Sequence, residues 1–472
     1  MTPRFDLLVI GGGPAGVTAA LRARELGAST AIVERDRLGG TCTDDGCAPT
    51  RVLARAARMV RDGQRSSAFG LLGSAPRVDL PRLLEHAQRT VYRLHEKKQL
   101  TAHLRSLGAE VFEEAGTARF VDPWTVELAD GRQLAAERTV ICVGGHARRL
   151  SLPGAELALT HSDVWSLRAL PGSLAIVGAS ATGTQLASIF AAFGSRVTLL
   201  EVASRILPGE DPLVSSVMSA ALQERGVEVR AGIGAIGGIE RNGRGLRVSV
   251  GEEMLPVDSV ILAMGWPGNV GGIGLETAGV AVDRGHIVVD ESLRTSVPNV
   301  YAAGDVTGRM MLVQSATAEA RVAVSNALSG TAEHVPHTVV PHGSFTDPEY
   351  ASVGTMTDAT AVVGYDELDR AVIDGRTEGF AKLAADAEGK LAGASVVGEQ
   401  AVEVVQVAAA AMAGGMRLEQ LADLELAYPT YAAILGLAAR RLLAKRQGPA
   451  DSRWHTIASA PPAEWEWREP AS

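Results

Sequence analysis

Two cysteines lie five positions apart in a glycine-rich segment, Cys42 and Cys47 within GGTCTDDGCAPTRVL. If this loop curls just ahead of a helix, the two sulfur atoms come close together. A thiolate near a helix N-terminus, or near a cation such as Arg51, is stabilised and reactive. Two buried thiols or half of a zinc site are the alternatives, but zinc needs further Cys or His ligands at suitable spacing, and none is evident. The spacing therefore predicts a redox-active disulfide and no metal site.

A glycine fingerprint near the N-terminus can hold a dinucleotide. Gly11, Gly13 and Gly16 follow the apolar stretch FDLLVI, which is typical of a buried parallel strand, and a helix and a second strand ending at Glu34 come next. Gly11 permits the tight turn, Gly13 lets the backbone approach a pyrophosphate, and Gly16 lets the helix pack on the strand. Glu34 can accept hydrogen bonds from a ribose. A tight turn without a ligand is the alternative, which the complete strand, helix, strand and acid disfavour.

The same pattern returns about 170 residues later in altered form. The strand SLAIV is followed by Gly178, Ser180 and Gly183, then by a helix and the strand RVTLLE, which ends at Glu201. Ser180 replaces the middle glycine, and its small side chain still admits a pyrophosphate. A carboxylate at Glu201 favours a free ribose 2′-hydroxyl over a 2′-phosphate, so NADH is the expected donor. NADPH stays possible because Arg205 follows closely, and a vestigial nucleotide domain is the structural alternative.

The other elements follow from coarser patterns along the 472 residues, a length that suits two to four domains. Residues 51–105 are expected to be largely helical and residues 109–134 to form hairpins. Two further helices are expected over residues 401–412 and 431–445.

Composition and charge exclude several classes of function. The formal net charge of -9 argues against nucleic-acid binding, which needs concentrated Lys and Arg. No apolar run approaches the roughly 18 residues of a membrane span, and Asp6 with the glycines after the first strand argues against a secretory signal. A cytoplasmic protein is therefore expected. Three cysteines are too few for a secreted disulfide framework, and Cys142, in an apolar strand, is interpreted as a buried structural thiol.

Together these motifs resemble the FAD-dependent pyridine nucleotide-disulfide oxidoreductases, the group of dihydrolipoamide dehydrogenase, glutathione reductase and mercuric reductase. The resemblance covers residues 4 to about 445. The family's cysteine motif matches Gly39 to Pro49, including Gly40 and Thr41. Its later flavin motif matches YAAGD, which contains Gly304 and Asp305, and Asp305 corresponds to the carboxylate that binds the ribityl chain. Further family matches are Gly116, Gly144, Gly265 and the segment FTDPE that opens the C-terminal domain.

The resemblance implies an α/β fold with two Rossmann-like dinucleotide-binding domains and a C-terminal α+β dimerisation domain. The expected domains are FAD-binding residues 1–148 and 269–334, NAD(P)-binding residues 149–268, dimerisation residues 335–446 and an extended tail, 447–472. The resemblance also implies a homodimer, in which the C-terminal domain of one subunit completes the active site of the other. FAD takes hydride from nicotinamide on one face and opens the disulfide on the other. Cys47 matches the thiol nearer the flavin, and Cys42 matches the interchange thiol that attacks the substrate.

The family's acid–base dyad is missing from this chain. Where relatives carry a His-Pro-Thr-x-x-Glu motif, Tyr428 stands in place of the His and Ala433 in place of the Glu. A tyrosine with a pKa near 10 is a poor base at neutral pH, although it can donate a hydrogen bond or stack on a substrate ring. Packing at the dimer interface is the structural alternative for Tyr428.

Other positions also depart from the family. Arg51 and Gln185 stand where relatives pair a Lys with a Glu, and the two changes are interpreted as coupled. Three further departures remain. Ala181 stands where many relatives have a bulky residue that gates the nicotinamide pocket. Trp266 stands where Arg is common in relatives, and Gln314 stands where several relatives have His.

The expected function is that of an NAD(P)H-dependent flavoprotein that passes electrons through the Cys42–Cys47 disulfide to a small-molecule acceptor. The acceptor is a disulfide or a quinone-like compound: Tyr-Pro in place of His-Pro resembles a quinone-reducing branch, whereas the intact cysteines favour a disulfide. Three alternatives stay open, namely reductive cleavage of a C–S bond as in a carboxylase-type relative, reduction of a soft metal ion by the cysteines, and a non-catalytic redox sensor.

Overall fold

The computed structural model describes residues 3–447 of the chain. These residues form two compact units that divide after Tyr350. Strands and helices are mixed throughout, so the α/β class expected from the sequence is confirmed. No helix within residues 3–447 is both long and apolar enough to cross a membrane. The expected tail lies, apart from its first residue, outside the described residues.

The N-terminal sheet is built around β1 (Arg4–Ile10), the first strand expected from the sequence. Residues 7–9 have no exposed surface, because a parallel sheet covered on both faces buries both sides of its strands. β1 pairs in parallel with β2 (Thr30–Val33) and with β6 (Gln133–Ile141). The order is β3-β2-β1-β6-β5-β4, with β16 (Val300–Ala302) parallel to β6.

The prediction of hairpins over residues 109–134 is correct only in part. β4 (Arg119–Asp122) and β5 (Thr125–Glu127) form an antiparallel meander with β6, as expected. β3 (Glu110–Phe112), however, pairs in parallel with β2 at the opposite edge of the sheet. A three-residue strand has too little periodicity to reveal its partner, which is set by a contact far away in the chain.

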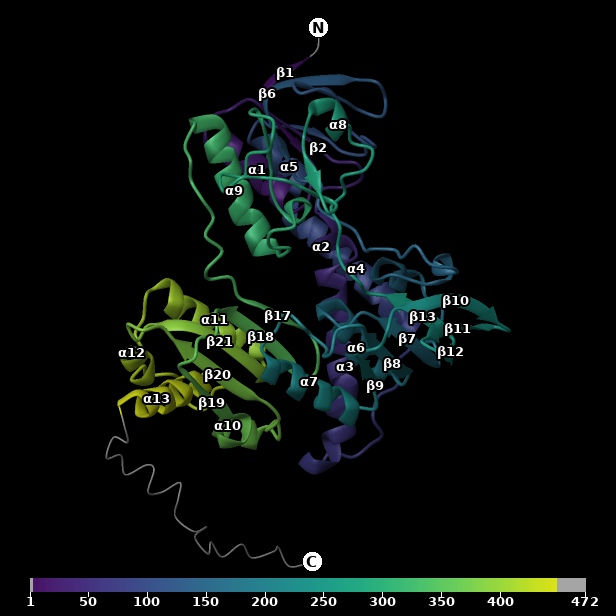
Figure 1. Ribbon diagram of the computed structural model, residues 1–472, viewed down its shortest axis with the longest axis vertical. Helices are drawn as coiled ribbons and strands as arrows, with labels where there is room; N and C mark the ends of the chain where they lie inside the picture. The colour runs from purple at the N-terminus through teal and green to yellow at the C-terminus, as the bar shows by residue number, and fades with distance from the viewer. Residues whose placement is uncertain (1–2, 448–472) are drawn as a thin grey trace, which may run out of the picture. The chain divides into compact units, whose positions relative to one another are not determined.

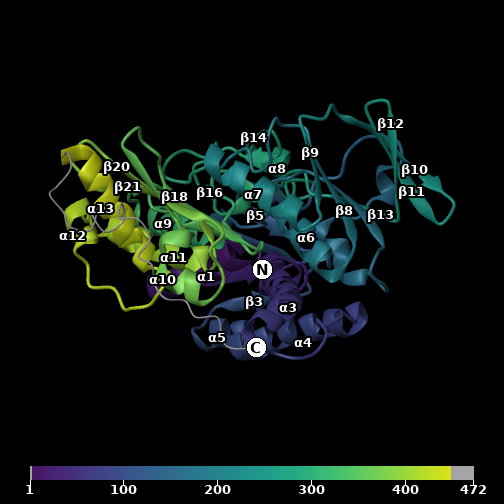
Figure 2. The ribbon, with the colours of Figure 1, turned by 90° about the horizontal axis from the view of Figure 1, so that it is seen from below.

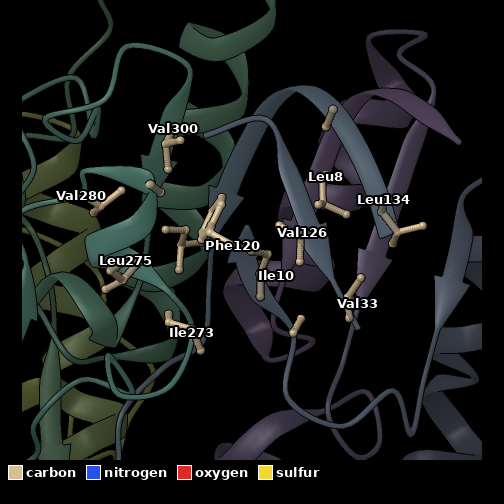
Figure 3. Close-up of a cluster of buried hydrophobic side chains, with 14 of the residues drawn as sticks. Leu8, Ile10, Val33, Phe120, Val126, Leu134, Ile273, Leu275, Val280 and Val300 are labelled. Atoms are coloured by element: carbon tan, nitrogen blue, oxygen red, sulfur yellow. The ribbon is translucent and has the colours of Figure 1, made fainter. Parts of the chain in front are cut away.

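Alternating side chains of β1 enter two separate apolar layers. Leu7 and Val9 face α1 (Pro14–Glu25) and α9 (Val313–Ser329), which lie side by side in Figure 1. On the other face, Figure 3 shows Leu8 and Ile10 in a cluster with side chains of β2, of the β4-β5-β6 meander, of β16 and of the segment that leads into β16: Val33, Phe120, Val126, Leu134, Ile273, Leu275, Val280 and Val300. The sheet is therefore covered on both faces.

A second parallel sheet carries the repeated glycine fingerprint. Its order is β13-β7-β8-β9, and helix α6 (Ala181–Phe193) connects β7 to β8, as the sequence predicts. A separate antiparallel sheet, β10-β11-β12, follows β9. The bounds are β7 (Ser173–Val177), β8 (Arg196–Glu201), α7 (Pro212–Glu224), β9 (Glu228–Ala231), β10 (Ile236–Asn242), β11 (Gly245–Val250), β12 (Glu253–Val257) and β13 (Ser259–Leu262).

Four helices follow the first strand pair, and the first two carry Cys42 and Cys47. They are α2 (Gly40–Asp44), α3 (Cys47–Arg65), α4 (Leu80–Lys98) and α5 (Leu100–Ser106), so the helical expectation for residues 51–105 is correct. Figure 2 shows α3 and α4 side by side, and α3 also packs on α6. Short elements complete the first unit: α8 (Leu275–Ala278), β14 (Val282–Asp283), β15 (His286–Ile287) and β17 (His342–Ser344).

A buried ion cluster joins α3 to the segment that precedes β18. The Asp347 carboxylate lies 3.3 Å from Arg61 Nη1 and 3.8 Å from both Arg58 Nη2 and Arg225 Nη2. The Arg61 and Asp347 side chains are only 8% and 9% exposed. Burial lowers the pKa of Arg61 to about 10, although the Asp347 charge opposes that shift. One carboxylate thus contacts three arginines in a poorly solvated place and offsets one of their three positive charges.

The second unit is an open sheet with helices packed on it. The sheet order is β17-β18-β21-β20-β19, where β18 spans the division between the units. Helix α11 packs on β21, and α13 packs on β19 and β20. Both helices expected from the sequence are present, two residues or fewer from the expected starts. The bounds are β18 (Glu349–Gly354), β19 (Thr360–Gly364), α10 (Asp369–Ile373), β20 (Phe380–Ala385), β21 (Leu391–Gly398), α11 (Ala401–Ala413), α12 (Leu418–Ala422) and α13 (Ala433–Gln447).

Candidate active site

Both glycine fingerprints fold into the same turn. A Cβ at Gly16 would lie 1.8 Å from the carbonyl oxygen of Gly11, and a Cβ at Gly183 would lie 1.8 Å from that of Gly178. Gly11 and Gly178 have φ angles of 102° and 99°, a region that favours glycine. The two turns are therefore close copies of one another, and each needs glycine at its first and last positions.

Ser180 takes the place of the middle glycine without strain. Its φ and ψ are -79° and -166°, against -71° and -172° for Gly13, and any residue can adopt this extended conformation. No side chain caps the first turn of α1 or of α6, so the amide groups there keep their donors for a ligand. The open backbone at Gly13 and these amides fit the pyrophosphate of a dinucleotide at each turn.

Glu34 and Glu201 hold equivalent positions beside the two turns. Glu34 Oε2 accepts a hydrogen bond from the Gly12 amide at 2.6 Å, and Glu201 Oε2 accepts one from the Ala179 amide at 2.7 Å. The other oxygen of each carboxylate accepts a bond from an amide two residues further along the chain, at 2.9 Å in both cases. These bonds fix both carboxylates at the strand ends, where the resemblance places the riboses.

Replacing Glu201 with Gln is expected to shift the enzyme from NADH toward NADPH. The amide side chain keeps the shape but removes the charge that repels a 2′-phosphate. The ratio of kcat/KM for NADPH to that for NADH should rise about tenfold, equivalent to about 1.4 kcal/mol. Steady-state kinetics with both donors measures this ratio. Glu34→Gln, the same change in the first repeat, should leave the ratio unaltered, and an unchanged ratio in Glu201→Gln would contradict the assignment.

The flavin motif contains a strained glycine held by a buried acid. Gly304 has φ 79° and ψ -159°, and a Cβ there would press on Ala15 and Ala316 at 3.2 and 3.3 Å. The Gly304 amide donates to Glu319 Oε2 at 2.8 Å, and Glu319 has no exposed surface. Sequence reasoning missed Glu319, because nothing in the sequence separates it from the other acids on helices. It fixes the turn that presents Asp305.

Asp305 receives a hydrogen bond that the sequence did not suggest. Trp266 Nε1 donates to Asp305 Oδ2 at 2.9 Å, and burial raises the pKa of this carboxyl, an effect that the indole partly offsets. Gly145 leaves room for the indole, since a Cβ there would lie 2.5 Å from Trp266 Nε1. The ring centre of His161 lies 5.2 Å from that of Trp266. Trp266, where relatives often carry Arg, therefore lies directly beside the expected ribityl-binding acid.

The other predicted glycines lie at turns of the first unit. Gly116, Gly144 and Gly265 have positive φ angles of 65°, 67° and 98°. The Gly116 amide donates to the backbone just after Glu34. The segment that begins at Gly144 pairs with the segment that follows Gly265. Gly144 and Gly265 thus lie at opposite ends of this pairing, opposite Asn269 and Arg148, whereas Gly116 lies beside the end of β2.

The two cysteines lie within hydrogen-bonding reach of each other. Cys42 lies in α2, Cys47 is the first residue of α3, and the Gly46 amide closes the loop on the Thr41 carbonyl at 2.7 Å. A hydrogen bond from Cys42 lowers the pKa of Cys47 to about 7, aided by a backbone amide at the start of α3, and raises the pKa of Cys42. When the cysteine pair is reduced, Cys47 therefore loses its proton before Cys42 does, and the negative charge lies on Cys47.

Gly40 brings the cysteine helix against the first glycine turn. A Cβ at Gly40 would lie 2.7 Å from the Cα of Gly13, so the two loops meet backbone to backbone. A cavity of about 150 Å³ is lined by Asp44, Pro49, Gln88, Val91 and Trp165. Asp44 and Pro49 each lie two positions from a cysteine, so this small, largely apolar cavity adjoins the cysteine loop.

Comparisons with known proteins agree with this arrangement. The profile of the pyridine nucleotide-disulphide oxidoreductases matches residues 5–320, and the profile of that family's dimerisation domain matches residues 340–439. This chain belongs to the pyridine nucleotide-disulphide oxidoreductase family. Its members use FAD and NAD(P)H, so the cofactors expected from the sequence are confirmed at that level, and the chain is an oxidoreductase. The dimerisation domain indicates a homodimer.

Similar oxidoreductases of this family carry different names. Dihydrolipoyl dehydrogenase 2 of Haloarcula marismortui is 32% identical, over 91% of this chain and 95% of its own length. A mercuric reductase of Streptomyces lividans is 33% identical, over 92% and 96%. Among solved structures, the HOCl-induced flavoprotein disulfide reductase RclA of Escherichia coli has a TM-score of 0.83 at 25% identity, over 92% and 99%. LpdA of Mycobacterium tuberculosis has a TM-score of 0.84 at 26% identity, over 93% and 100%.

Arg51 and Gln185 replace the family's Lys–Glu pair, and both contact Phe345. The Arg51 guanidinium lies 4.5 Å from the centre of the Phe345 ring and 3.2 Å from Glu349 Oε1. Gln185 Oε1 accepts a hydrogen bond from the Phe345 amide at 3.1 Å. The structure therefore links the two substitutions through one shared residue, while the cation that lowers the Cys42 pKa is Lys98.

Tyr428 replaces the family histidine on an exposed segment of the second unit. Its side chain is 77% exposed, and its hydroxyl donates to Asp369 Oδ2 at 3.1 Å. That hydrogen bond and the carboxylate charge raise the Tyr428 pKa above its usual value. Ala433 begins α13 and offers no carboxylate. Asp369, which sequence reasoning missed, is the acid that pairs with this tyrosine.

Proposed function

We propose that this oxidoreductase passes electrons from NADH, through bound flavin and the Cys42–Cys47 pair, to a disulfide or quinone-like acceptor. The observation that carries the proposal is the hydrogen-bonded cysteine pair, in which the pKa of Cys47 is lowered to about 7. A thiolate is the reactive form of cysteine in exchange and toward soft electrophiles. The overall reaction with a disulfide consumes one NADH and one proton and yields two thiols.

The site residues divide into two cofactor sites and one thiol site under this proposal. FAD would be held within residues 1–148 and 269–334 by Gly11, Gly13, Gly16, Glu34, Gly40, Thr41, Gly116, Gly144, Gly304 and Asp305, and NADH within residues 149–268 by Gly178, Ser180, Gly183, Glu201 and Gly265. The chemistry that bound flavin would supply is acceptance of a hydride from NADH and transfer of two electrons to the cysteine pair. Residues 335–446 would form the dimerisation domain. The active site would use Cys42, Cys47 and Arg51, with Tyr428 supplied by the C-terminal domain of the other subunit, as the resemblance implies.

The Tyr428–Asp369 contact favours an acceptor that needs little help from a base. Its hydroxyl proton is engaged by Asp369, and its raised pKa makes deprotonation harder still. The cavity beside the cysteine loop is large enough for one aromatic ring. Its walls include Pro49, Val91 and Trp165, and Gln88 offers an amide donor for a carbonyl oxygen. A quinone-like acceptor matches these features better than an anionic disulfide does, because Asp44 also lines the cavity.

Anaerobic titration with NADH tests the thiol route. If the pair accepts electrons, the first equivalent of NADH produces a long-wavelength absorbance band from a thiolate against the flavin. Direct bleaching without such a band would mean that the cysteines are redox-silent and would overturn the proposed route. Turnover of the reduced enzyme with a benzoquinone and with a small uncharged disulfide then ranks the two acceptors.

The long-wavelength band is expected to depend on pH. Because the Cys47 pKa is lowered to about 7, Cys47 is a thiolate above that pH and a neutral thiol below it. The band should therefore grow as pH rises, with a midpoint near 7, and fade in acid. Absorbance of the two-electron-reduced enzyme between pH 5.5 and 9 measures the midpoint. A midpoint near the ordinary thiol value of about 8.5 would show that Cys42 does not stabilise this thiolate.

Reduction of a soft metal ion is a second candidate function. The relatives include mercuric reductases, and one solved neighbour, with a TM-score of 0.81, is a Cu(II) complex of RclA. Two adjacent sulfur atoms are ligands that Hg(II) and copper ions bind strongly. NADH oxidation driven by Hg(II) or Cu(II), and lost in Cys42→Ser, would support this function over the quinone reaction.

A further inference from the structure

The last turn of α4 presents two basic side chains to the short helix that carries Cys42. Lys98 Nζ donates to Thr43 Oγ1 at 2.9 Å, and His95 Nε2 lies 2.6 Å from Asp44 Oδ1. His95 and Lys98 are three residues apart, so they lie on the same face of the helix. Thr43 and Asp44 directly follow Cys42, which places both contacts within two residues of the thiol.

These contacts hold α2 closely. The Thr43 side chain is buried, and the His95 side chain is only 13% exposed. A Cβ at Gly39, just before α2, would lie 2.8 Å from His95 Cε1, so the imidazole packs directly on the backbone. A displacement of α2 would therefore break two hydrogen bonds and this packing contact together.

We propose that Lys98 is a positioning residue that stabilises the Cys42 thiolate from within the same chain, while His95 holds α2 in place for it. The proposal rests on the proposed role of Cys42 as the thiol that attacks the acceptor. In this family the resemblance assigns support of that thiol to a His–Glu dyad, which is absent here. Under this proposal, Lys98 supports the thiolate as a fixed positive charge and neither accepts nor donates a proton.

The charges that face Cys42 leave this role to Lys98. Cys47, on α3, accepts a hydrogen bond from the Cys42 thiol. This hydrogen bond is the largest cause of the raised Cys42 pKa, and burial is the second. The Asp305 carboxylate raises it further, and Lys98 alone among these groups lowers it. On α2 itself, Asp44 is engaged by His95. A positive charge at Lys98 is therefore the group that offsets the negative ones around this sulfur.

The exchange step shows where the cation acts. The Cys42 proton passes to the Cys47 thiolate, and the Cys42 thiolate attacks an acceptor disulfide, forming a mixed disulfide and releasing one thiolate. Cys47 gives its proton to that thiolate and attacks the Cys42 sulfur. This re-forms the Cys42–Cys47 bond and releases a second thiolate, which takes a proton from water. Two electrons pass from the cysteine pair to the acceptor, and only the first step needs charge on Cys42.

Alkylation of Cys42 tests the proposal without any turnover. In a Cys47→Ser background, the pH dependence of iodoacetamide labelling reports the Cys42 pKa, since Cys142 is buried. Lys98→Met should raise the midpoint by about one pH unit, with labelling about tenfold slower at pH 8, as expected for loss of a nearby cation. Lys98→Arg should restore the midpoint. Lys97→Met, one residue away on the same helix and also exposed, is the matched control and should leave it unchanged.

The outcomes separate the possibilities cleanly. An unchanged midpoint in Lys98→Met, or an equal shift in Lys97→Met, overturns the proposal. If Lys98→Met does not fold, Lys98→Gln, which keeps a hydrogen-bond donor for Thr43, replaces it and should show the same rise. The labelling midpoint does not depend on NADH or on an acceptor. The proposed function can therefore fail in the anaerobic titration while the Lys98 effect stands, or the reverse.

Discussion

The Cys47→Ser enzyme should accept hydride from NADH but pass almost nothing on to a disulfide acceptor. The serine hydroxyl cannot form a thiolate or re-form a disulfide, so the route through the cysteines ends at the flavin. Disulfide turnover should fall by more than roughly 1,000-fold, as when other covalent nucleophiles are removed. The long-wavelength band should be absent in the same variant, because the pair's negative charge resides on Cys47. Stopped-flow spectroscopy and steady-state kinetics measure both effects.

Cys42→Ser is the matched control for this result. It should lose disulfide turnover to a similar degree, because the attacking thiol is gone. It should nevertheless keep the long-wavelength band above neutral pH, since Cys47 remains at the start of α3 and the serine hydroxyl can donate the hydrogen bond that Cys42 donates in the unchanged enzyme. Substantial disulfide turnover by Cys47→Ser would place the electron exit at the flavin itself. Quinone turnover that survives in both variants would identify a quinone as a direct acceptor from flavin.

Asp347→Asn should destabilise the first unit more than any other single change considered. The substitution leaves Arg58, Arg61 and Arg225 close together with the carboxylate charge removed, and all three contacts involve side chains that are at most 13% exposed. Removing one partner from a buried ion cluster costs about 3–5 kcal/mol of unfolding free energy. Urea unfolding followed by circular dichroism should show the transition at a clearly lower urea concentration.

An exposed pair of the same chemistry provides the comparison. Asp283 lies 3.8 Å from Arg284, and their side chains are 72% and 91% exposed. Asp283→Asn should change the unfolding free energy by less than about 1 kcal/mol, since water screens such pairs. Equal effects of Asp283→Asn and Asp347→Asn would show that the buried cluster gains nothing from its carboxylate.

Local patterns predicted the parts of this site that depend on neighbours in the chain. A glycine turn after an apolar strand, an acid at the next strand end, and two cysteines before a helix are short-range signals, and the family match confirms the fold that they indicate. Ser180 has an extended backbone conformation that any residue can adopt, so the change from glycine does not strain the turn; that the turn admits a pyrophosphate stays a prediction.

Contacts between distant segments could not be read in the same way. Trp266 bonds to Asp305 and Lys98 bonds to Thr43 only because the fold brings those segments together. Asp369 lies 59 positions from Tyr428 in the sequence, and nothing in the sequence distinguishes it from the other aspartates as the partner of Tyr428. The cation expected at Arg51 is likewise directed to Phe345 and Glu349. Side-chain pairing over long separations is set by packing, which a single sequence does not display.

The backbone contact between Gly40 and Gly13 ties thiol chemistry to cofactor retention. The same contact joins the loop that carries Cys42 to the turn at which the flavin pyrophosphate is expected. Thermodynamic linkage is reciprocal: if bound FAD alters the reduction potential of the cysteine pair, reduction of the pair alters the affinity for FAD by the equivalent free energy. On that condition, a change in the redox state of the thiols would change the affinity of the enzyme for its own flavin.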